Sequence, residues 1–359
     1  MSILSSVVLV NLVVAAITAL IVTWLSIPFY IKLVSKIGLK GIDQQKEGKP
    51  ELATSGGIPA FSGLMLGVMV FILLTAFSNG FNDIHVIKQK MFLLAGVLAI
   101  GIITVVGLFD DIYMKKIEAR KRSDTVEKRH GLKQWLKPLL TFFGAIPLIV
   151  VMAGSTLLGI PLIGTVDFGI FYPLVLIPLA VICVSNATNM LAGFNGLEAG
   201  LMVVASFTLA VFCFLWGRLE GAVIALTLCF ASLAFLKFNW FPAKILPGDS
   251  LTYFLGGAFV TAVIIGDVER FGMLIFLPWV VEAILKLRGR FNVRSFGDLQ
   301  KDGTLKAPYP KIYSLTHIVM LLPEKLWGKR LKEKQVVMVL IAFEVILCIA
   351  LFLFYQLTL

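Results

Sequence analysis

The chain consists of long apolar stretches separated by polar connections. Runs of about 20 apolar residues, the length that crosses a bilayer as a helix, recur from one end to the other. The strands of a membrane β-barrel would instead alternate polar and apolar residues over about ten positions, and no such alternation is present. We therefore predict an all-α polytopic membrane protein that forms a single transmembrane domain, residues 1–359.

The apolar runs predict about ten transmembrane helices joined by nine connections. The predicted spans lie near residues 3–29, 57–77, 91–108, 138–153, 168–184, 198–216, 221–236, 251–266, 270–286 and 336–357. The fourth connection, residues 154–167, has glycine and proline turns and is expected to form a short hairpin. The ninth connection, residues 287–335, is the longest.

Composition excludes a soluble protein of this length. Hydrophobic residues make up 58% of the chain and charged residues 15%, whereas a soluble domain carries roughly a quarter charged residues. The three histidines are scattered and the four cysteines lie in apolar spans, so neither residue type shows metal-ligand spacing.

The basic residues predict the orientation. Of the 32 lysines and arginines, 28 lie in or at the edge of the odd-numbered connections. Cytoplasmic loops are enriched in Lys and Arg, so the odd connections are expected in the cytoplasm and both termini outside. The net charge of +11 then indicates attraction to an anionic membrane surface and no nucleic-acid partner.

Polar residues at the edges of spans are costly and are therefore candidates for function. Asp110 and Asp111 end the third span, where paired carboxylates suggest a cation, a basic partner or a proton-transfer role, or else a solvated helix end. Asp249 precedes the eighth span and is either a metal ligand or a helix N-cap. Arg288 and Arg290 open the ninth connection, where they suit a phosphate group or simply follow the positive-inside rule.

The fifth connection is the most unusual, because it holds no lysine or arginine. It reads SNATNMLAGFNGLEAG from residue 185 to residue 200, with three asparagines, three glycines and one glutamate between two apolar spans. Side-chain amides suit a base edge or a metal, and glycines allow close backbone approach. All four clusters lie in odd connections, so we expect them on the same face of the membrane. Carboxylates together with arginines on that face indicate phosphoryl transfer between a soluble anionic substrate and a lipid.

These motifs resemble the polyprenyl-phosphate N-acetylhexosamine-1-phosphate transferases. The strongest match is the segment from Asn186 to Gly200, and residues 107–111, 239–240 and 248–249 fit further motifs. The chain looks most like the eukaryotic and archaeal branch, because arginines stand where bacterial branches carry a histidine-rich motif. The resemblance covers the whole chain, including ten spans with both termini outside.

The resemblance implies a Mg²⁺-dependent enzyme, with Mn²⁺ as an alternative metal. It would transfer GlcNAc-1-phosphate from UDP-GlcNAc to a polyprenyl or dolichyl phosphate, releasing UMP in the first lipid-linked step of N-glycan-type assembly. It would lie in the cell membrane of a prokaryote or the endoplasmic reticulum of a eukaryote, with its active site in the cytoplasm. A homodimer is an open alternative to the monomer, since relatives often pair.

The resemblance also implies a role for each matching residue. Metal ligands would be Asn189 and Asp249, and the reacting phosphates would lie beside Asp110 and Asp111. Nucleotide and sugar contacts would come from Asn186, Asn195, Glu198, Arg288 and Arg290, within a substrate-binding loop over residues 287–335. A basic residue after the aspartates would contact phosphate, and we expect Lys133, with Lys137 as the alternative.

A transporter or flippase of lipid-linked or nucleotide sugars is the alternative function. Such proteins place ionisable groups near the bilayer midplane. Here Glu282 and Glu344 lie well inside predicted spans, and the sequence shows no partner for either. The family's usual polar residue three positions after the aspartate pair is also replaced, by Met114.

Overall fold

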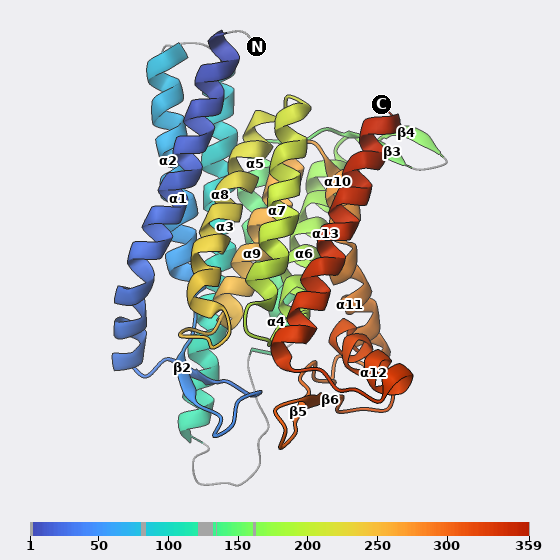
Figure 1. Ribbon diagram of the computed structural model, residues 1–359. Coiled ribbons are helices and arrows are strands. Elements are labelled where there is room, and N and C mark those ends of the chain that lie inside the picture. The colour runs from blue at the N-terminus through green and yellow to red at the C-terminus, as the bar shows by residue number, and fades with distance from the viewer. Residues whose placement is uncertain (1–2, 80–83, 121–131, 134, 161–162, 359) are drawn as a thin grey trace.

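The computed structural model describes residues 3–79, 84–120, 132–133, 135–160 and 163–358. The structure is a bundle of helices, most of which run along one common direction (Figure 1). Eight of the described helices are long and apolar enough to cross a membrane. These helices are α1 (Ile3–Lys36), α2 (Gly57–Asn79), α3 (Ile84–Arg120), α6 (Ile177–Met190) with the preceding π-helical turn η2 (Tyr172–Leu176), α7 (Leu197–Leu215), α8 (Leu219–Asn239), α9 (Gly248–Ile265) and α13 (Glu333–Thr358).

Two of the ten predicted spans are not single long helices, which corrects the expectation. The fourth is α4 (Leu136–Phe142), the 3₁₀ turn η1 (Phe143–Ala145) and α5 (Ile146–Val150) in succession. The ninth is α10 (Glu269–Ile275) followed by α11 (Leu277–Arg288), with Phe276 at the break and Pro278 in the first turn of α11. Proline supplies no backbone N–H and favours the start of a helix, so the apolar run is interrupted there.

Short hairpins and one further helix occupy the connections. The predicted hairpin in residues 154–167 is confirmed, since β3 (Leu157–Ile160) pairs antiparallel with β4 (Gly164–Asp167). The other elements are β1 (Lys40–Ile42) paired with β2 (Glu51–Ala53), β5 (Asp298–Leu299) paired with β6 (Leu305–Lys306), and α12 (Leu315–Trp327).

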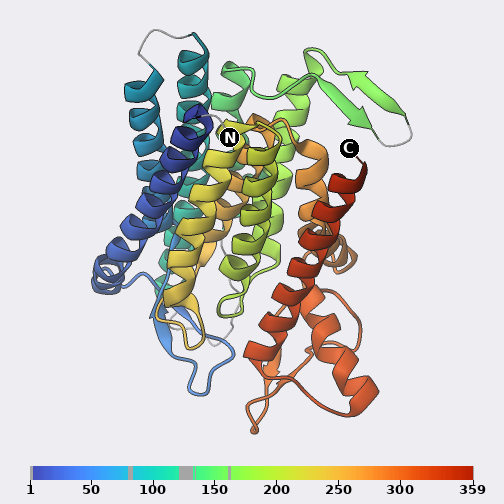
Figure 2. The same ribbon diagram turned by 45° about the horizontal axis from the view of Figure 1, so that its top comes forward.

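The two ends of the bundle differ in the way that the charge pattern predicts. Both termini and the β3–β4 hairpin lie at one end, and the β1–β2 and β5–β6 hairpins with α12 lie at the other (Figures 1 and 2). The second end, where α1, α3, α6, α8 and α11 finish, carries the odd-numbered connections, and we call it the basic end. All four polar clusters therefore meet at one end of the bundle.

Helix α9 forms the centre of the bundle. Its window of apolar residues is 89% buried, against 28% for α13 and 33% for α1. It packs against α3, α6 and α8, and residues 250–265 are all buried. The first turn of α9 is consequently held by several neighbours at the basic end, and Asp249 lies in that turn.

Candidate active site

Three carboxylates and a lysine meet where α3, α4 and α9 approach one another at the basic end. Asp110 and Asp111 lie on α3, Lys137 lies in the first turn of α4, and Asp249 is the second residue of α9. The close approach of α3 to α9 requires Gly107, because a Cβ there would lie 2.5 Å from the backbone oxygen of Asp249. The two motifs that the sequence placed 138 residues apart are therefore in direct contact.

Lys137 bridges two of the carboxylates. Its Nζ forms an ion pair with Asp110 and lies 3.0 Å from Asp249 Oδ2. Asp110 is 1% exposed, whereas the side chains of Lys137 and Asp249 are 21% and 28% exposed. Lys137 and Asp249 are therefore accessible from solvent, and Asp110 lies behind them, where it also accepts the N–H of Leu132 at 2.8 Å.

Asp111 has a different role from Asp110. Its carboxylate accepts the backbone N–H groups of Asp249 and Ser250, at 2.7 and 3.0 Å, and the hydroxyl of Ser55 at 2.6 Å. The first N–H groups of a helix have no partner within the helix, and a carboxylate there also interacts favourably with the helix dipole. Asp111 thus caps α9 from a neighbouring helix and fixes the turn that presents Asp249.

Asn189 completes this group from the last turn of α6. Its side chain hydrogen bonds Asp249, and its Oδ1 accepts the hydroxyl of Thr252 at 3.2 Å. Carboxylate and amide oxygens are ligands that suit Mg²⁺, which commonly takes one or two of them from the protein and the rest from substrate phosphates and water. Within the described ranges no three His, Cys, Asp or Glu side chains form a metal-holding group. Asp249 and Asn189 together supply one carboxylate and one amide, which is the number of ligands that Mg²⁺ commonly takes from a protein.

The remaining candidates of the fifth connection separate into different environments. Asn186 faces its neighbouring helices, where it donates to the Ile182 carbonyl at 2.8 Å and accepts the Tyr253 hydroxyl at 3.0 Å. Glu198, 3% exposed in the first turn of α7, accepts the N–H of Gly193 at 2.5 Å and so closes the glycine-rich turn. Both contacts shape the loop around Asn189.

Asn195 belongs to a second polar cluster, for which the sequence provided no local signal. Its side chain donates to Asp43 at 2.9 Å, and its backbone N–H donates to Glu333 at 2.8 Å. Lys46 forms ion pairs with both Asp43 and Glu333. This cluster joins the first connection, the fifth connection and the start of α13. Its members are far apart in sequence, so no local pattern links them.

The arginines of the ninth connection are exposed. Arg288 ends α11 and lies over the ring of Tyr313, 5.8 Å from its centroid, and Arg290 follows in a turn with φ of 51°. The ninth connection approaches the fifth, because Ser295 Oγ lies 3.5 Å from the Met190 carbonyl, next to Asn189. The guanidinium groups of Arg288 and Arg290 are exposed to solvent, on the same connection that contacts the end of α6.

Of the two lysines considered for the phosphate contact, Lys137 is the one that pairs with the carboxylates. Lys133 lies before α4 and its side chain is exposed. The charged residues 121–131 of the third connection lie outside the described residues. The contact of Lys133 with phosphate stays a prediction, and Lys137 is the alternative that lies among the carboxylates.

Glu282 and Glu344 are both fully buried, but their surroundings differ. Glu282 has partners that the sequence did not reveal, namely Lys286, Ser314 and the N–H of Leu315. Glu344 accepts the thiol of Cys348 at 3.5 Å within α13.

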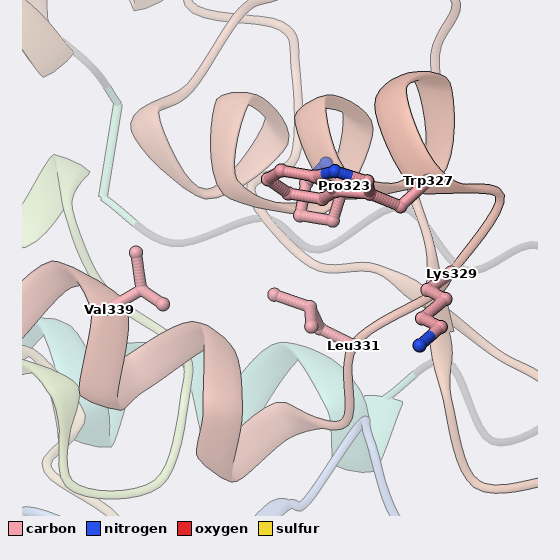
Figure 3. A pocket seen from close by; sticks show the side chains of 5 residues that line it. All are labelled: Pro323, Trp327, Lys329, Leu331 and Val339. Carbon is pink, nitrogen blue, oxygen red and sulfur yellow. The ribbon is translucent and has the colours of Figure 1, made fainter.

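A shallow pocket between α12 and α13 lies apart from the group of carboxylates around Lys137. Its lining residues are Pro323, Trp327, Lys329, Leu331 and Val339 (Figure 3). Helix α12 buries His317 and Met320 and exposes Leu322, Leu326 and Trp327. That pattern is typical of an amphipathic helix at a membrane surface, and the pocket offers one cation and no carboxylate.

Comparison with known proteins agrees with this arrangement. Residues 93–267, which hold both aspartate motifs and the asparagine-rich connection, match the family described as Glycosyl transferase family 4. A protein of Saccharolobus solfataricus, provisionally named UDP-N-acetylglucosamine–dolichyl-phosphate N-acetylglucosaminephosphotransferase, is 33% identical over 91% of this chain and 92% of its own. The chain belongs to glycosyl transferase family 4.

Two further relatives differ from each other in the substrates that their names give. The UDP-N-acetylglucosamine–dolichyl-phosphate N-acetylglucosaminephosphotransferase of Dictyostelium discoideum is 25% identical over 76% of this chain and 71% of its own. A phospho-N-acetylmuramoyl-pentapeptide-transferase of Clostridium botulinum is 29% identical over 72% of this chain and 74% of its own. The resemblance seen in the motifs is thereby confirmed, and the chain is a membrane transferase of the glycosyl-1-phosphate type.

Proposed function

We propose that this family 4 member transfers N-acetylglucosamine-1-phosphate from UDP-GlcNAc to dolichyl phosphate or a similar polyprenyl phosphate. The products are polyprenyl-diphospho-GlcNAc and UMP. The observation that carries the proposal is Lys137 bridging Asp110 and Asp249 beside Asn189, at the end of the bundle that also holds the exposed Arg288. The names of the Saccharolobus and Dictyostelium relatives support the same substrates.

The attacking group needs little activation. A phosphate monoester has a second pKa near 6, so the lipid phosphate arrives largely as a dianion at neutral pH. One of its oxygens forms a bond to the phosphorus that carries the sugar, and the bond from that phosphorus to the oxygen of UMP breaks. Since no strong base is required, catalysis rests on placing the two phosphates and balancing their charge.

The residues divide that work between them. Lys137, partly exposed and fixed by Asp110 behind it, contacts the transferring phosphate. Asp249 and Asn189 would hold Mg²⁺, or Mn²⁺, which when bound neutralises the negative charge of the diphosphate. Arg288 and Arg290, in the ninth connection, contact the diphosphate or the sugar. Asn195 and Glu198, in the fifth connection, shape the part of the site that binds the nucleotide.

The orientation and the lipid path are part of the same proposal. The basic end faces the cytoplasm by the positive-inside rule, with both termini outside. We propose that the lipid phosphate enters between helices of the bundle from the surrounding bilayer.

The test is UMP release by the purified protein in detergent, with Mg²⁺ and no gradient. UDP-GlcNAc should be compared with UDP-GalNAc and UDP-MurNAc-pentapeptide, and dolichyl phosphate with undecaprenyl phosphate. We expect turnover with UDP-GlcNAc, and none when Asp249 is replaced by Ala in a protein that remains folded. Absence of UMP release with every pair would contradict the proposal and favour the transporter alternative.

A further inference from the structure

A buried ion pair lies at the base of the ninth connection, apart from the carboxylates of the active site. Glu282 and Lys286 are one turn apart on α11 and are 0% and 6% exposed. Lys286 Nζ lies 3.7 Å from Glu282 Oε1. Removing two charges from water costs several kcal/mol per ion unless hydrogen bonds satisfy both groups, so the other partners of this pair indicate its role.

Glu282 fixes the start of α12. Its Oε2 accepts the N–H of Leu315 at 2.7 Å and the hydroxyl of Ser314 at 3.1 Å. Ser314 itself caps α12 by accepting the N–H of Thr316. One carboxylate of α11 therefore holds the helix that follows the arginine-bearing turn.

Lys286 fixes the chain on the near side of the same turn. Its Nζ donates to the Val293 carbonyl at 3.1 Å and to Ser295 Oγ at 2.5 Å. Arg290 and Phe291, which lie between Lys286 and Val293, have φ of 51° and 57°. L-residues seldom adopt this conformation, and it costs about 1 kcal/mol or more per residue. The turn persists because both of its ends are tied to the buried pair.

His317 adds a third tie from α12. Its Nδ1 accepts the N–H of Tyr313 at 3.3 Å, so the ring donates from Nε2 to the Arg294 carbonyl at 3.1 Å. Burial and the nearby positive charge of Lys286 lower the pKa of His317 to about 4, which keeps the ring neutral in this role. Arg294 and Arg290 thus lie on one backbone segment held by α11 and α12 together.

Ser295 connects this framework to the active site. Its Oγ lies within 3.5 Å of both Glu282 Oε1 and the carbonyl of Met190, the residue after Asn189. Its carbonyl accepts the hydroxyl of Thr316 at 2.8 Å. The buried side chain of Ser295 therefore links the arginine turn to the end of α6, where the metal-ligand candidate Asn189 lies.

We propose that Glu282, Lys286 and Ser295 are positioning residues that set the arginine turn of residues 288–294 against the end of α6, and so govern the affinity for the nucleotide-sugar diphosphate. The inference rests on the proposed function, since it assumes that Arg288 and Arg290 contact the diphosphate. It predicts an effect on one substrate only. The lipid phosphate does not depend on this turn for its binding.

The test compares Glu282→Gln, Lys286→Met, Ser295→Ala and the double variant Glu282→Gln/Lys286→Met with the wild-type chain. Each charge variant should raise the KM for UDP-GlcNAc about tenfold, because a misplaced arginine loses a charge-assisted contact, while the KM for the lipid phosphate stays within about twofold. Lys325→Met on the exposed surface of α12 is the matched control and should leave both constants unchanged.

The double variant separates positioning by the pair from a simple charge effect. Each single variant leaves one buried charge without its partner, whereas the double variant leaves none. The double variant should therefore have a KM for UDP-GlcNAc similar to that of Lys286→Met, because both variants lack the Lys286 contacts to Val293 and Ser295. A KM in the double variant equal to the product of the two single effects would overturn the role of the pair.

Other outcomes are equally informative. If the single charge variants do not fold, Ser295→Ala carries the test, with an expected rise of about threefold in the KM for UDP-GlcNAc alone, the size of a neutral hydrogen bond. Unchanged KM values in folded variants, or equal rises for both substrates, would overturn the inference. Wild-type protein without UMP release would instead contradict the proposed function itself.

Discussion

The carboxylate of Asp111 caps the helix that begins beside Asp249, with 2.7 Å between Asp111 Oδ1 and the Asp249 nitrogen. Its neighbour Asp110 turns instead to Lys137 and the N–H of Leu132. Two adjacent carboxylates that look equivalent in the sequence thus perform different tasks. Asp111 holds the backbone that carries Asp249, and Asp110 holds Lys137, the lysine that pairs with Asp249.

This division predicts that both variants lose activity but that only Asp111→Ala loses stability. Asp111→Ala removes the acceptor of three hydrogen bonds and should lower the free energy of unfolding by about 1–3 kcal/mol, with a clear fall in Tm and in activity. Asp110→Asn keeps an acceptor for Leu132 and leaves Lys137 paired with Asp249, so Tm should change little while UMP release falls at least about tenfold. Thermal unfolding in detergent measures the Tm of each variant, and UMP release measures its activity. An Asp111→Ala protein with the wild-type Tm would contradict the capping role.

Lys137 and Lys133 should differ sharply when each is replaced. Lys137→Met removes the cation between Asp110 and Asp249, so two close carboxylates remain and the transferring phosphate loses its contact. We expect a loss of about a hundredfold or more in kcat/KM, comparable to removing one preorganised charge from a phosphoryl-transfer site. Lys133→Met, on an exposed side chain, should lose far less. Equal losses in the two variants would restore Lys133 as a phosphate contact.

These two lysines also show where prediction from the sequence ended. The apolar runs and the charge pattern predicted the bundle, its polarity and the end where Asp110, Asn189 and Asp249 meet. They could not distinguish two lysines four residues apart, because the choice depends on where α4 begins, and α4 begins at Leu136. Hydropathy alone also treated the ninth span as continuous, although Pro278 in the first turn of α11 marks the break.

Contacts between distant segments could not be predicted from the sequence, for a different reason. Lys46 and Glu333 are 287 residues apart and form an ion pair next to Asn195. Glu282 finds its partners in Ser314 and Leu315, which lie on the far side of the ninth connection. Neither pairing leaves a periodic or local pattern, since each depends on which ends of helices the fold brings together.

Metal removal should abolish turnover reversibly. Only Asp249 and Asn189 are proposed as protein ligands, so the ion is held partly by substrate and should exchange readily with chelator. EDTA should stop UMP release, and Mg²⁺ or Mn²⁺ should restore it. Asn189→Ala should raise the Mg²⁺ concentration for half-maximal rate about tenfold, whereas Lys329→Ala on the surface should not change it. Full activity in excess EDTA would contradict the metal assignment.

The stability of helix α12, in the ninth connection, should depend on pH through His317. The pKa of His317 is lowered from 6.5 to about 4 in the folded protein by burial and by Lys286. Between these two values the unfolded chain takes up a proton that the folded chain does not, so this contribution to stability is complete above pH 6.5 and is lost as the pH falls toward 4.

His317→Gln isolates that contribution, because the glutamine amide can still donate to the Arg294 carbonyl but does not titrate. Tm should be measured at several pH values from 7.5 to 5 for both proteins, a range chosen around the ordinary histidine pKa of about 6.5. Titrations of carboxylates are common to the two proteins and cancel in the comparison. The wild-type Tm should therefore fall more steeply than that of the variant, and parallel curves would show that His317 is already protonated in the folded state or remains exposed to water.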